Sequence, residues 1–195
     1  AETRRVKKLE QAHFALAFEG PGYMAPDFYA AQIWTSALGG GMSSRLFQKI
    51  REERGLCYSI FAQSAAYEDT GNITVYAGTS EEEIGDLTLL TLDELKRAAE
   101  DMSEAEVARA RAQLKAGLLM GLESPSARAE RNARLLAIWG RVPDVDEAVA
   151  RIDAVTMADV RRYAGDMAAA QVALALYGPV AQAPDLEAIR RRLAA

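Results

Sequence analysis

The sequence predicts an α+β fold, with a mostly antiparallel sheet and helices packed on one face of it. Alternating, strand-like segments lie near both ends of the chain, a hairpin pattern lies between them, and most of the remainder has helical periodicity. We expect the two outer strands to join the hairpin in one sheet. With 195 residues and no visible linker, the chain is expected to form a single domain over 1-195.

The first half contains three strand patterns and two helix patterns. Phe14, Leu16 and Phe18 alternate with smaller residues and predict a strand with one large-residue face. After it we expect, in chain order, a helix from Pro26 to about Leu38, a short helix ending near Arg54, and strands over roughly 56–67 and 72–79. The turn at 69–72 contains glycine and asparagine, which tolerate positive φ, and therefore predicts a hairpin.

Helices dominate the second half, and their starts carry capping signals. Ser80 with Glu83 resembles a capping box, and Ser103 with Glu106 forms a cleaner one. We expect, in order, helices to about Glu100, through Leu122, from Pro125 to Gly140, from Thr156 to about Met167, and from Pro184 onward. An alternating segment at 172–177 predicts a last strand.

Charge and hydropathy exclude several classes of partner. The net charge of -5 and the pI near 5.1 argue against nucleic acid, because a phosphate-binding face usually needs a basic excess. The arginines at 190–192 are interpreted as the solvated side of a terminal helix. No apolar run is long enough to span a bilayer, and no signal peptide is visible. The chain begins with Ala rather than Met, which suggests a processed product or part of a longer chain.

Two residues that often carry chemistry occur once each. Cys57 excludes an internal disulfide and fits a reducing compartment; it lies in a strand pattern and is expected to be a buried small hydrophobe. His13 is the only histidine, so a self-contained catalytic zinc site built on two or more histidines is excluded. We expect His13 to be structural. Ser-His-Asp chemistry is not formally excluded, although no Gly-x-Ser-x-Gly elbow accompanies the histidine.

The most informative stretch runs from Gly39, Gly40 and Gly41 to Tyr58. Arg51, in the last turn of the short helix, precedes Tyr58 by seven residues, so a guanidinium and a phenol can converge where helix and strand meet. They are either a solvated arginine and a half-buried tyrosine, or a donor pair aimed at a peptide carbonyl or a developing oxyanion. The glycines form either a flexible connection or a peptide-contacting loop. The lysine of a nucleotide P-loop does not follow them, and the dinucleotide spacing is absent.

This stretch resembles the C-terminal half of the M16 zinc metallopeptidases, the pitrilysin and insulysin family. The likeness is carried by L-G-G-G-M-S-S-R-L-F-Q at 38–48 and R-E-E-R-G-L-C-Y-S at 51–59. It is greatest to the branch of the mitochondrial processing peptidase β-subunit and its bacterial relatives. Supporting segments lie at 10–13, 76–79, 111–120 and 140–141.

The resemblance implies that the chain is one of two homologous α+β halves around an enclosed chamber. The first half of family members carries the zinc motif His-x-x-Glu-His and a further glutamate ligand. The second half contributes an arginine and a tyrosine, which match Arg51 and Tyr58 and would bind substrate main chain and help to stabilise the tetrahedral intermediate. Zinc would then belong to the other half or to a partner subunit. The motif His-x-x-Glu-His does not occur here, so this chain binds no catalytic zinc of that kind and cannot hydrolyse peptides alone by that mechanism.

The resemblance therefore implies the substrate-binding C-terminal half of a zinc-dependent metalloendopeptidase that acts on peptides or presequences. Its expected partners are a zinc-binding M16 half or homologous subunit and a peptide substrate, without nucleic acid or membrane insertion. The alternatives are a non-catalytic structural subunit, such as a core protein of a bc1-type complex, and a regulatory peptide-binding M16 partner. We expect a cytoplasmic location in a bacterium, which the Ala- and Arg-rich composition favours, or the mitochondrial matrix in a eukaryote.

Overall fold

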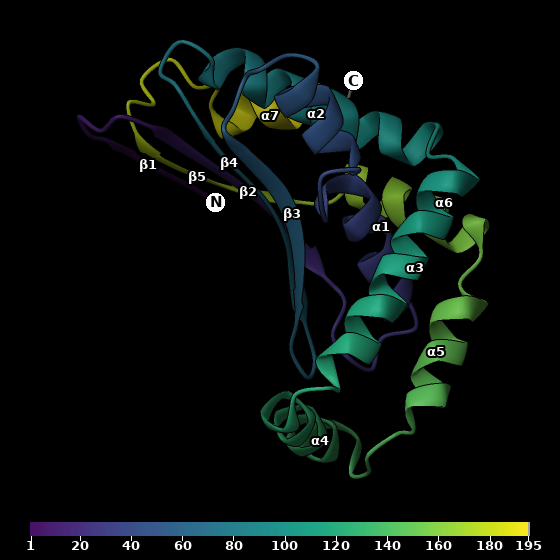
Figure 1. Cartoon of the computed structure of the whole chain (residues 1–195). Helices are drawn as coiled ribbons and strands as arrows, with labels where there is room; N and C mark the ends of the chain where they lie inside the picture. The colour runs from purple at the N-terminus through teal and green to yellow at the C-terminus, as the bar shows by residue number, and fades with distance from the viewer. Residues whose placement is uncertain (195) are drawn as a thin grey trace.

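The computed structural model describes residues 1–194, which form a five-stranded sheet covered by helices on one face (Figure 1). The strands are β1 (Glu2–Val6), β2 (Ala12–Gly20), β3 (Ser59–Ala66), β4 (Gly71–Thr79) and β5 (Val172–Gly178). Their order across the sheet is β1-β5-β2-β4-β3, and only β1 and β5 pair in parallel. The predicted α+β class and mostly antiparallel sheet are confirmed.

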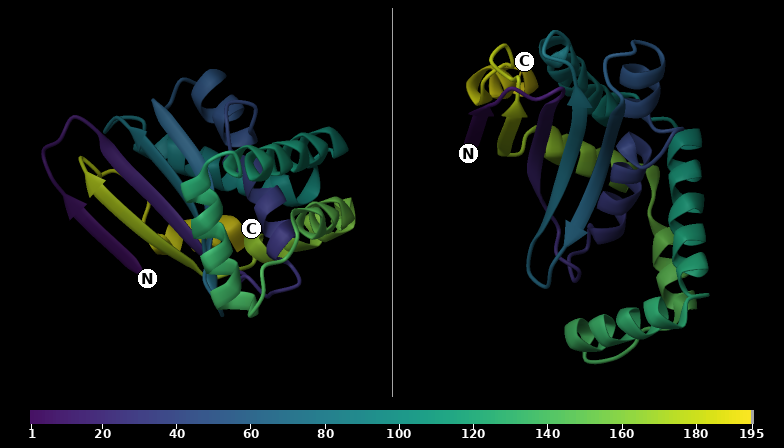
Figure 2. Two further views of the ribbon diagram at one scale, coloured as in Figure 1. Left: turned by 60° about the horizontal axis from the view of Figure 1, so that its bottom comes forward. Right: turned by 60° about the vertical axis from the view of Figure 1, so that its left-hand side comes forward.

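The helical segments run along and beyond this sheet. They are α1 (Phe28–Gly39), η1 (Phe47–Glu52), α2 (Ile84–Glu100), α3 (Glu104–Gly121), α4 (Pro125–Trp139), α5 (Val145–Ala154), α6 (Met157–Ala168) and α7 (Leu186–Ala194). The views in Figures 1 and 2 agree that α4 projects away from the sheet, at the far end of the α3 and α5 pair. Within residues 1–194, no helix is long and apolar enough to cross a membrane.

Alternation along the strands decides which face becomes the core. Leu16 of β2 lies between Val75 of β4 and Leu174 of β5 in the register, and all three side chains are buried under the helices. The residue before it, Ala15, points to the open face of the sheet. A slip of one residue would turn the large apolar side chains out to water, so this pattern fixes the register.

Two elements had no counterpart in the sequence-based expectations. β1 is a polar strand at the sheet edge, and Arg4 holds it in place by donating to the main-chain carbonyls of Val180, Ala183 and Pro184. Helix α5 begins after its N-cap residue Asp144, whose side chain accepts from the main-chain N–H of Asp146. Alternation of apolar and polar residues identifies strands that have one apolar face, and β1 has no apolar face.

Some predicted details are corrected by the structure. Glu83 N–H does donate to the Ser80 hydroxyl, at 3.2 Å, but the helix begins only at Ile84, so this contact caps a turn before the helix. Cys57 precedes β3 instead of lying inside it. The box of Ser103 and Glu106 is confirmed, with both reciprocal hydrogen bonds present.

Candidate functional site

The short helix η1 turns the chain from the glycine loop into β3. It is π-wound: Glu53 N–H donates to the Gln48 carbonyl at 2.9 Å, and Leu46 and Ile50 are fully buried beneath it. Gly55 follows with a φ of 65°, a left-handed conformation that favours glycine. This tight ending brings the last turn of η1 close to the residues that precede β3.

The structure brings Arg51 and Tyr58 together. The Arg51 guanidinium carbon lies 5.6 Å from the Tyr58 ring centroid and 4.5 Å from the Phe47 ring centroid, both within cation–π range. The Tyr58 side chain is 78% exposed and that of Arg51 is 34% exposed. The carboxylate nearest to Arg51 in the described residues, Glu52, is 4.0 Å away, so the guanidinium keeps N–H donors for a ligand.

Phe47 was not singled out in the sequence. It is one helical turn before Arg51, and a spacing of four residues places side chains on the same side of a helix, so the spacing itself was an available signal. The Arg51 guanidinium therefore contacts two aromatic rings, those of Phe47 and Tyr58.

The three glycines have different local environments. A Cβ on Gly39 would stand 2.4 Å from the main-chain nitrogen of Ala62, and one on Gly40 would stand 2.7 Å from the Cα of Ser36. Close packing therefore explains these two, and neither has a positive φ. Gly41 is exposed with open space around its Cα, and peptide contact by this loop stays a prediction.

A charged network fixes the end of the glycine loop to α3. Arg45, whose side chain is 12% exposed, donates to both carboxylate oxygens of Glu106, at 2.5 and 3.0 Å, and also to Asp101. Burial alone would raise the pKa of Glu106, but hydrogen bonds from Arg45 and Ser103 outweigh it and lower that pKa to about 2. The two partners are 61 residues apart, so sequence spacing gave no signal for this pair.

Cys57 and His13 are not exposed catalytic groups. Burial raises the pKa of the Cys57 thiol to about 11, despite the opposing charge of Arg51, so the thiol is protonated at neutral pH. His13 lies half-buried on the open face of the sheet, and its Nδ1 is 2.8 Å from the Tyr76 hydroxyl. These positions agree with a small apolar role for the cysteine and a structural role for the histidine.

The described residues do not fit a zinc site. No group of three or more His, Cys, Asp or Glu side chains within 1–194 is placed to hold a metal ion, and the sequence has a single histidine. The chemistry available at the seam of η1 and β3 is hydrogen-bond donation from Arg51 and Tyr58 to an acceptor such as a peptide carbonyl.

The sequence profile of a protein family described as the peptidase M16 inactive domain matches residues 1–114. The chain is 38% identical over 175 residues to the uncharacterized zinc protease SCO5738 of Streptomyces coelicolor, and 34% identical over 183 residues to the uncharacterized zinc protease YmxG of Bacillus subtilis. These alignments cover 89% and 92% of this chain, but only 38% and 44% of the two relatives. The chain thus spans about two fifths of their length.

The fold is similar to a chain in the structure of complex III2 from Candida albicans with Inz-5 bound. The TM-score is 0.90 at 26% sequence identity, and the match covers 99% of this chain and 49% of the other.

Proposed function

The chain belongs to the M16 peptidase family, and we propose that it is the substrate-binding half of a zinc-dependent metalloendopeptidase. One observation carries this proposal above the others: Arg51 is held at the rings of Phe47 and Tyr58 with its guanidinium open to a ligand. A solvated arginine at a helix end would not need two aromatic contacts. The proposal treats residues 1-195 as a single domain.

The two donors suit a peptide bond in complementary ways. A guanidinium offers several charged N–H donors in a fixed plane, and a phenol offers one neutral O–H donor. Both can hold the carbonyl of bound peptide main chain. Both become more valuable when that oxygen gains negative charge during hydrolysis, because a preorganised donor stabilises a developing oxyanion more than a neutral carbonyl.

The hydrolytic chemistry would come from elsewhere. Since these residues do not fit zinc, the proposed partner is a zinc-binding M16 half or homologous subunit, and Arg51 and Tyr58 would face it across the bound peptide. The exposed Gly41 loop lies directly before η1 and is a candidate for further peptide contact. The relatives in Streptomyces coelicolor and Bacillus subtilis favour a bacterial protein, and a cytoplasmic location is part of the proposal.

Reconstitution tests the proposal. The chain is mixed with a zinc-bearing M16 half, and cleavage of a fluorogenic peptide is followed for the wild type, Arg51→Ala and Tyr58→Phe. Loss of one oxyanion donor typically costs about 10²-fold in kcat. Arg54→Ala is the matched control, because Arg54 is an exposed arginine just beyond η1. Gel filtration must show that all variants still assemble; full cleavage by Arg51→Ala and Tyr58→Phe would remove the assigned roles.

A second candidate is a non-catalytic structural subunit. The similarity to a chain of complex III2 over nearly the whole length favours it. Purification of the natural protein separates the two: copurification with a haem-containing membrane complex, without peptidase activity, supports the structural role, and zinc-dependent peptidase activity supports the first proposal.

A further inference from the structure

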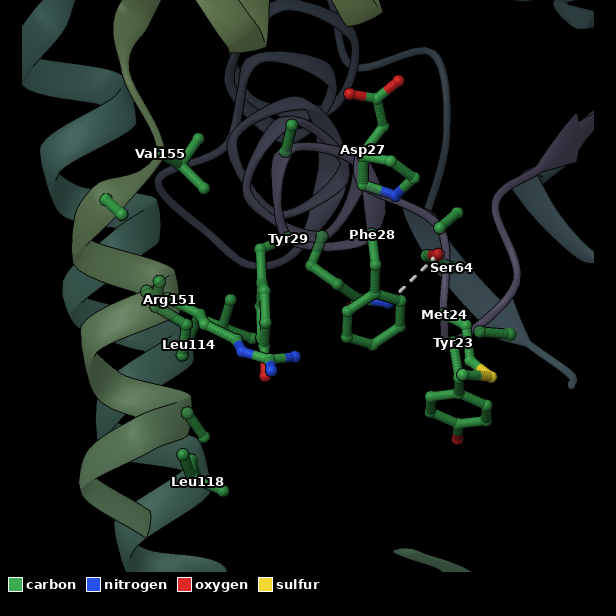
Figure 3. A pocket seen from close by; sticks show the side chains of 18 of the residues that line it. Tyr23, Met24, Asp27, Phe28, Tyr29, Ser64, Leu114, Leu118, Arg151 and Val155 are labelled. Atoms are coloured by element: carbon green, nitrogen blue, oxygen red, sulfur yellow. Dashed lines mark hydrogen bonds between the residues drawn. The ribbon is translucent and has the colours of Figure 1, made fainter. Parts of the chain in front are cut away.

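A hollow, shown in Figure 3, lies at the end of β3 that is opposite to Arg51 and Tyr58. Its volume is about 1030 Å³, and its walls come from the start of α1 and the segment before it, the end of β3, and α3, α4, α5 and α6. Figure 3 shows Phe28 and Tyr29 pointing into it, with Leu114 and Leu118 on its wall. Sites for small ligands usually have about 300–1,000 Å³, so the volume of this hollow is at the upper end of that range.

One wall of the hollow, formed by helix α4, is only partly covered by the rest of the chain. Helix α4 buries none of its residues, and its Leu135 and Trp139 side chains are only half-buried where they line the hollow. Together with Phe28 and the leucines of α3, they leave apolar surface on several separate walls. This arrangement suits a ligand with more than one bulky apolar group.

The charges around the hollow are basic, in contrast to the net charge of -5 for the whole chain. Arg162 forms salt bridges with Asp27 and Asp159, and Arg151 forms one with Glu147. Arg131 and Arg134 of α4 also line the hollow, and neither forms a salt bridge with any of residues 1–194.

Besides Arg131 and Arg134, the Tyr29 hydroxyl is a polar group that lines the hollow. Burial raises the pKa of Tyr29, and the nearby Arg151 and Arg131 charges only partly oppose that effect. The Tyr29 hydroxyl therefore stays protonated and can donate a hydrogen bond beside Arg131. The combination of an unpaired guanidinium and a neutral donor is suited to a carboxylate.

We infer that this hollow binds an acidic amphipathic peptide segment, in which a carboxylate meets Arg131 and Arg134 and bulky apolar side chains cover Trp139 and the facing walls. The choice of a peptide rests on the proposed function of the chain, and on the size and separated apolar walls of the hollow. The site is distinct from Arg51 and Tyr58, since β3 separates the two.

Tryptophan fluorescence tests the inference directly. The chain has two tryptophans: Trp34 is fully buried, and Trp139 lines the hollow and reports on its occupancy. The probe is the peptide Leu-Glu-Phe-Glu-Leu with both ends blocked, titrated into the wild type and an Arg131→Gln/Arg134→Gln variant. We expect the double variant to bind at least about tenfold more weakly, and the same loss for the wild type with Gln in place of both Glu residues of the peptide.

Control variants test whether the loss of peptide affinity is specific to the arginines that line the hollow. An Arg190→Gln/Arg191→Gln variant removes the same charge from exposed positions of α7 and should bind as the wild type does. Tyr29→Phe, a smaller change, should weaken binding less than the double variant, and circular dichroism verifies that each variant is folded.

Three results would overturn the inference: equal affinity for the Glu and Gln peptides, binding of dodecanoate but not of the peptide, or burial of Trp139 by a second copy of the chain in a concentration-dependent dimer. Arg54→Ala, which changes an exposed arginine that does not line the hollow, should leave this affinity unchanged. Failure here with intact reconstitution results would therefore reject the hollow as a peptide site without rejecting the proposed function.

Discussion

Helices α1 and α4 have similar lengths, 12 and 15 residues, but are held by different forces. The N-terminus of α1 has no side-chain cap, and Gly40 after it is not left-handed, yet eight of its residues are buried, including Trp34. Helix α4 begins with a capping Ser124 and Pro125, ends at Gly140 with a φ of 65°, and buries no residue.

The contrast separates two sources of helix stability. Packing of an apolar face holds α1 regardless of its weak ends, whereas local end signals hold α4 without a core. Changes in α1 should therefore act on the global free energy of unfolding, and changes in α4 should act on local opening. Because no buried residue fixes α4, this helix can also adjust its position to a ligand in the hollow beside it.

The largest difference in the free energy of unfolding is expected between substitutions of the two tryptophans, Trp34 in α1 and Trp139 in α4. Trp34→Ala should lower the free energy of unfolding by about 3–5 kcal/mol, because it leaves a cavity in the core. Trp139→Ala should cost about 1 kcal/mol or less, since it mainly removes the contact with Arg151, whose guanidinium carbon is 5.2 Å from the ring centroid. Urea denaturation measures both; equal losses would contradict the comparison.

The second largest effect is expected at the salt bridge between Arg45, which follows α1 and the glycine loop, and Glu106 of α3, the helix that precedes α4. The Glu106 pKa is about 2 in the folded chain, below its ordinary 4.5, so its contribution is present above pH 4.5 and is lost as pH falls towards 2. Because solvent screens this partly exposed pair, that loss should be about 1–2 kcal/mol. Unfolding of the wild type and Glu106→Gln from pH 6 to 2 measures it, with exposed Glu104→Gln as the control. A pH dependence unchanged in Glu106→Gln would reject this role.

Two glycine substitutions should have opposite signs. Gly140→Ala places a side chain at a φ of 65°, which costs about 1–2 kcal/mol, and should increase hydrogen exchange of the α4 amides. Gly117→Ala, in the exposed middle of α3 with open space around it, should stabilise by about 0.5–1 kcal/mol. Stabilisation by both would show that α4 does not depend on its C-terminal glycine.

The smallest effect is expected from the N-terminal cap of α4. Ser124 accepts from Ala127 N–H at 3.3 Å, and Ser124→Ala should weaken the helix by about 1 kcal/mol. Hydrogen exchange should rise in the first turn of α4, with no change in α1. A uniform rise over the whole chain would mean that α4 is part of the global folding unit.

The parts of the fold that the sequence predicted are those with local patterns. Alternation located β2 and β5, and the capping box at Ser103 located α3, as found. β1 was missed because a polar edge strand such as Glu2–Val6 shows no alternation, and its anchor, Arg4, binds carbonyls more than 170 residues away.

In the candidate site, too, local contacts could be predicted from the sequence and long-range contacts could not. The approach of Arg51 to Tyr58 could be predicted, because Gly55 marks the end of a helix just before a strand. The bond between Arg45 and Glu106 could not, since only the folded chain brings these residues together. The hollow was also unpredictable, because its walls come from six separate helices and strands.

Strand β3 has a consequence for any peptide that uses both ends of it. Tyr58 precedes its first residue, and Ser64 to Tyr67 line the hollow at its other end. Its eight residues span roughly 26 Å, so an extended peptide lying along it would need about eight residues to touch both places. Peptide affinity would then depend on length in one step. It would rise once a peptide is long enough to contact both Tyr58 and the hollow, because the second of these contacts then forms within one complex.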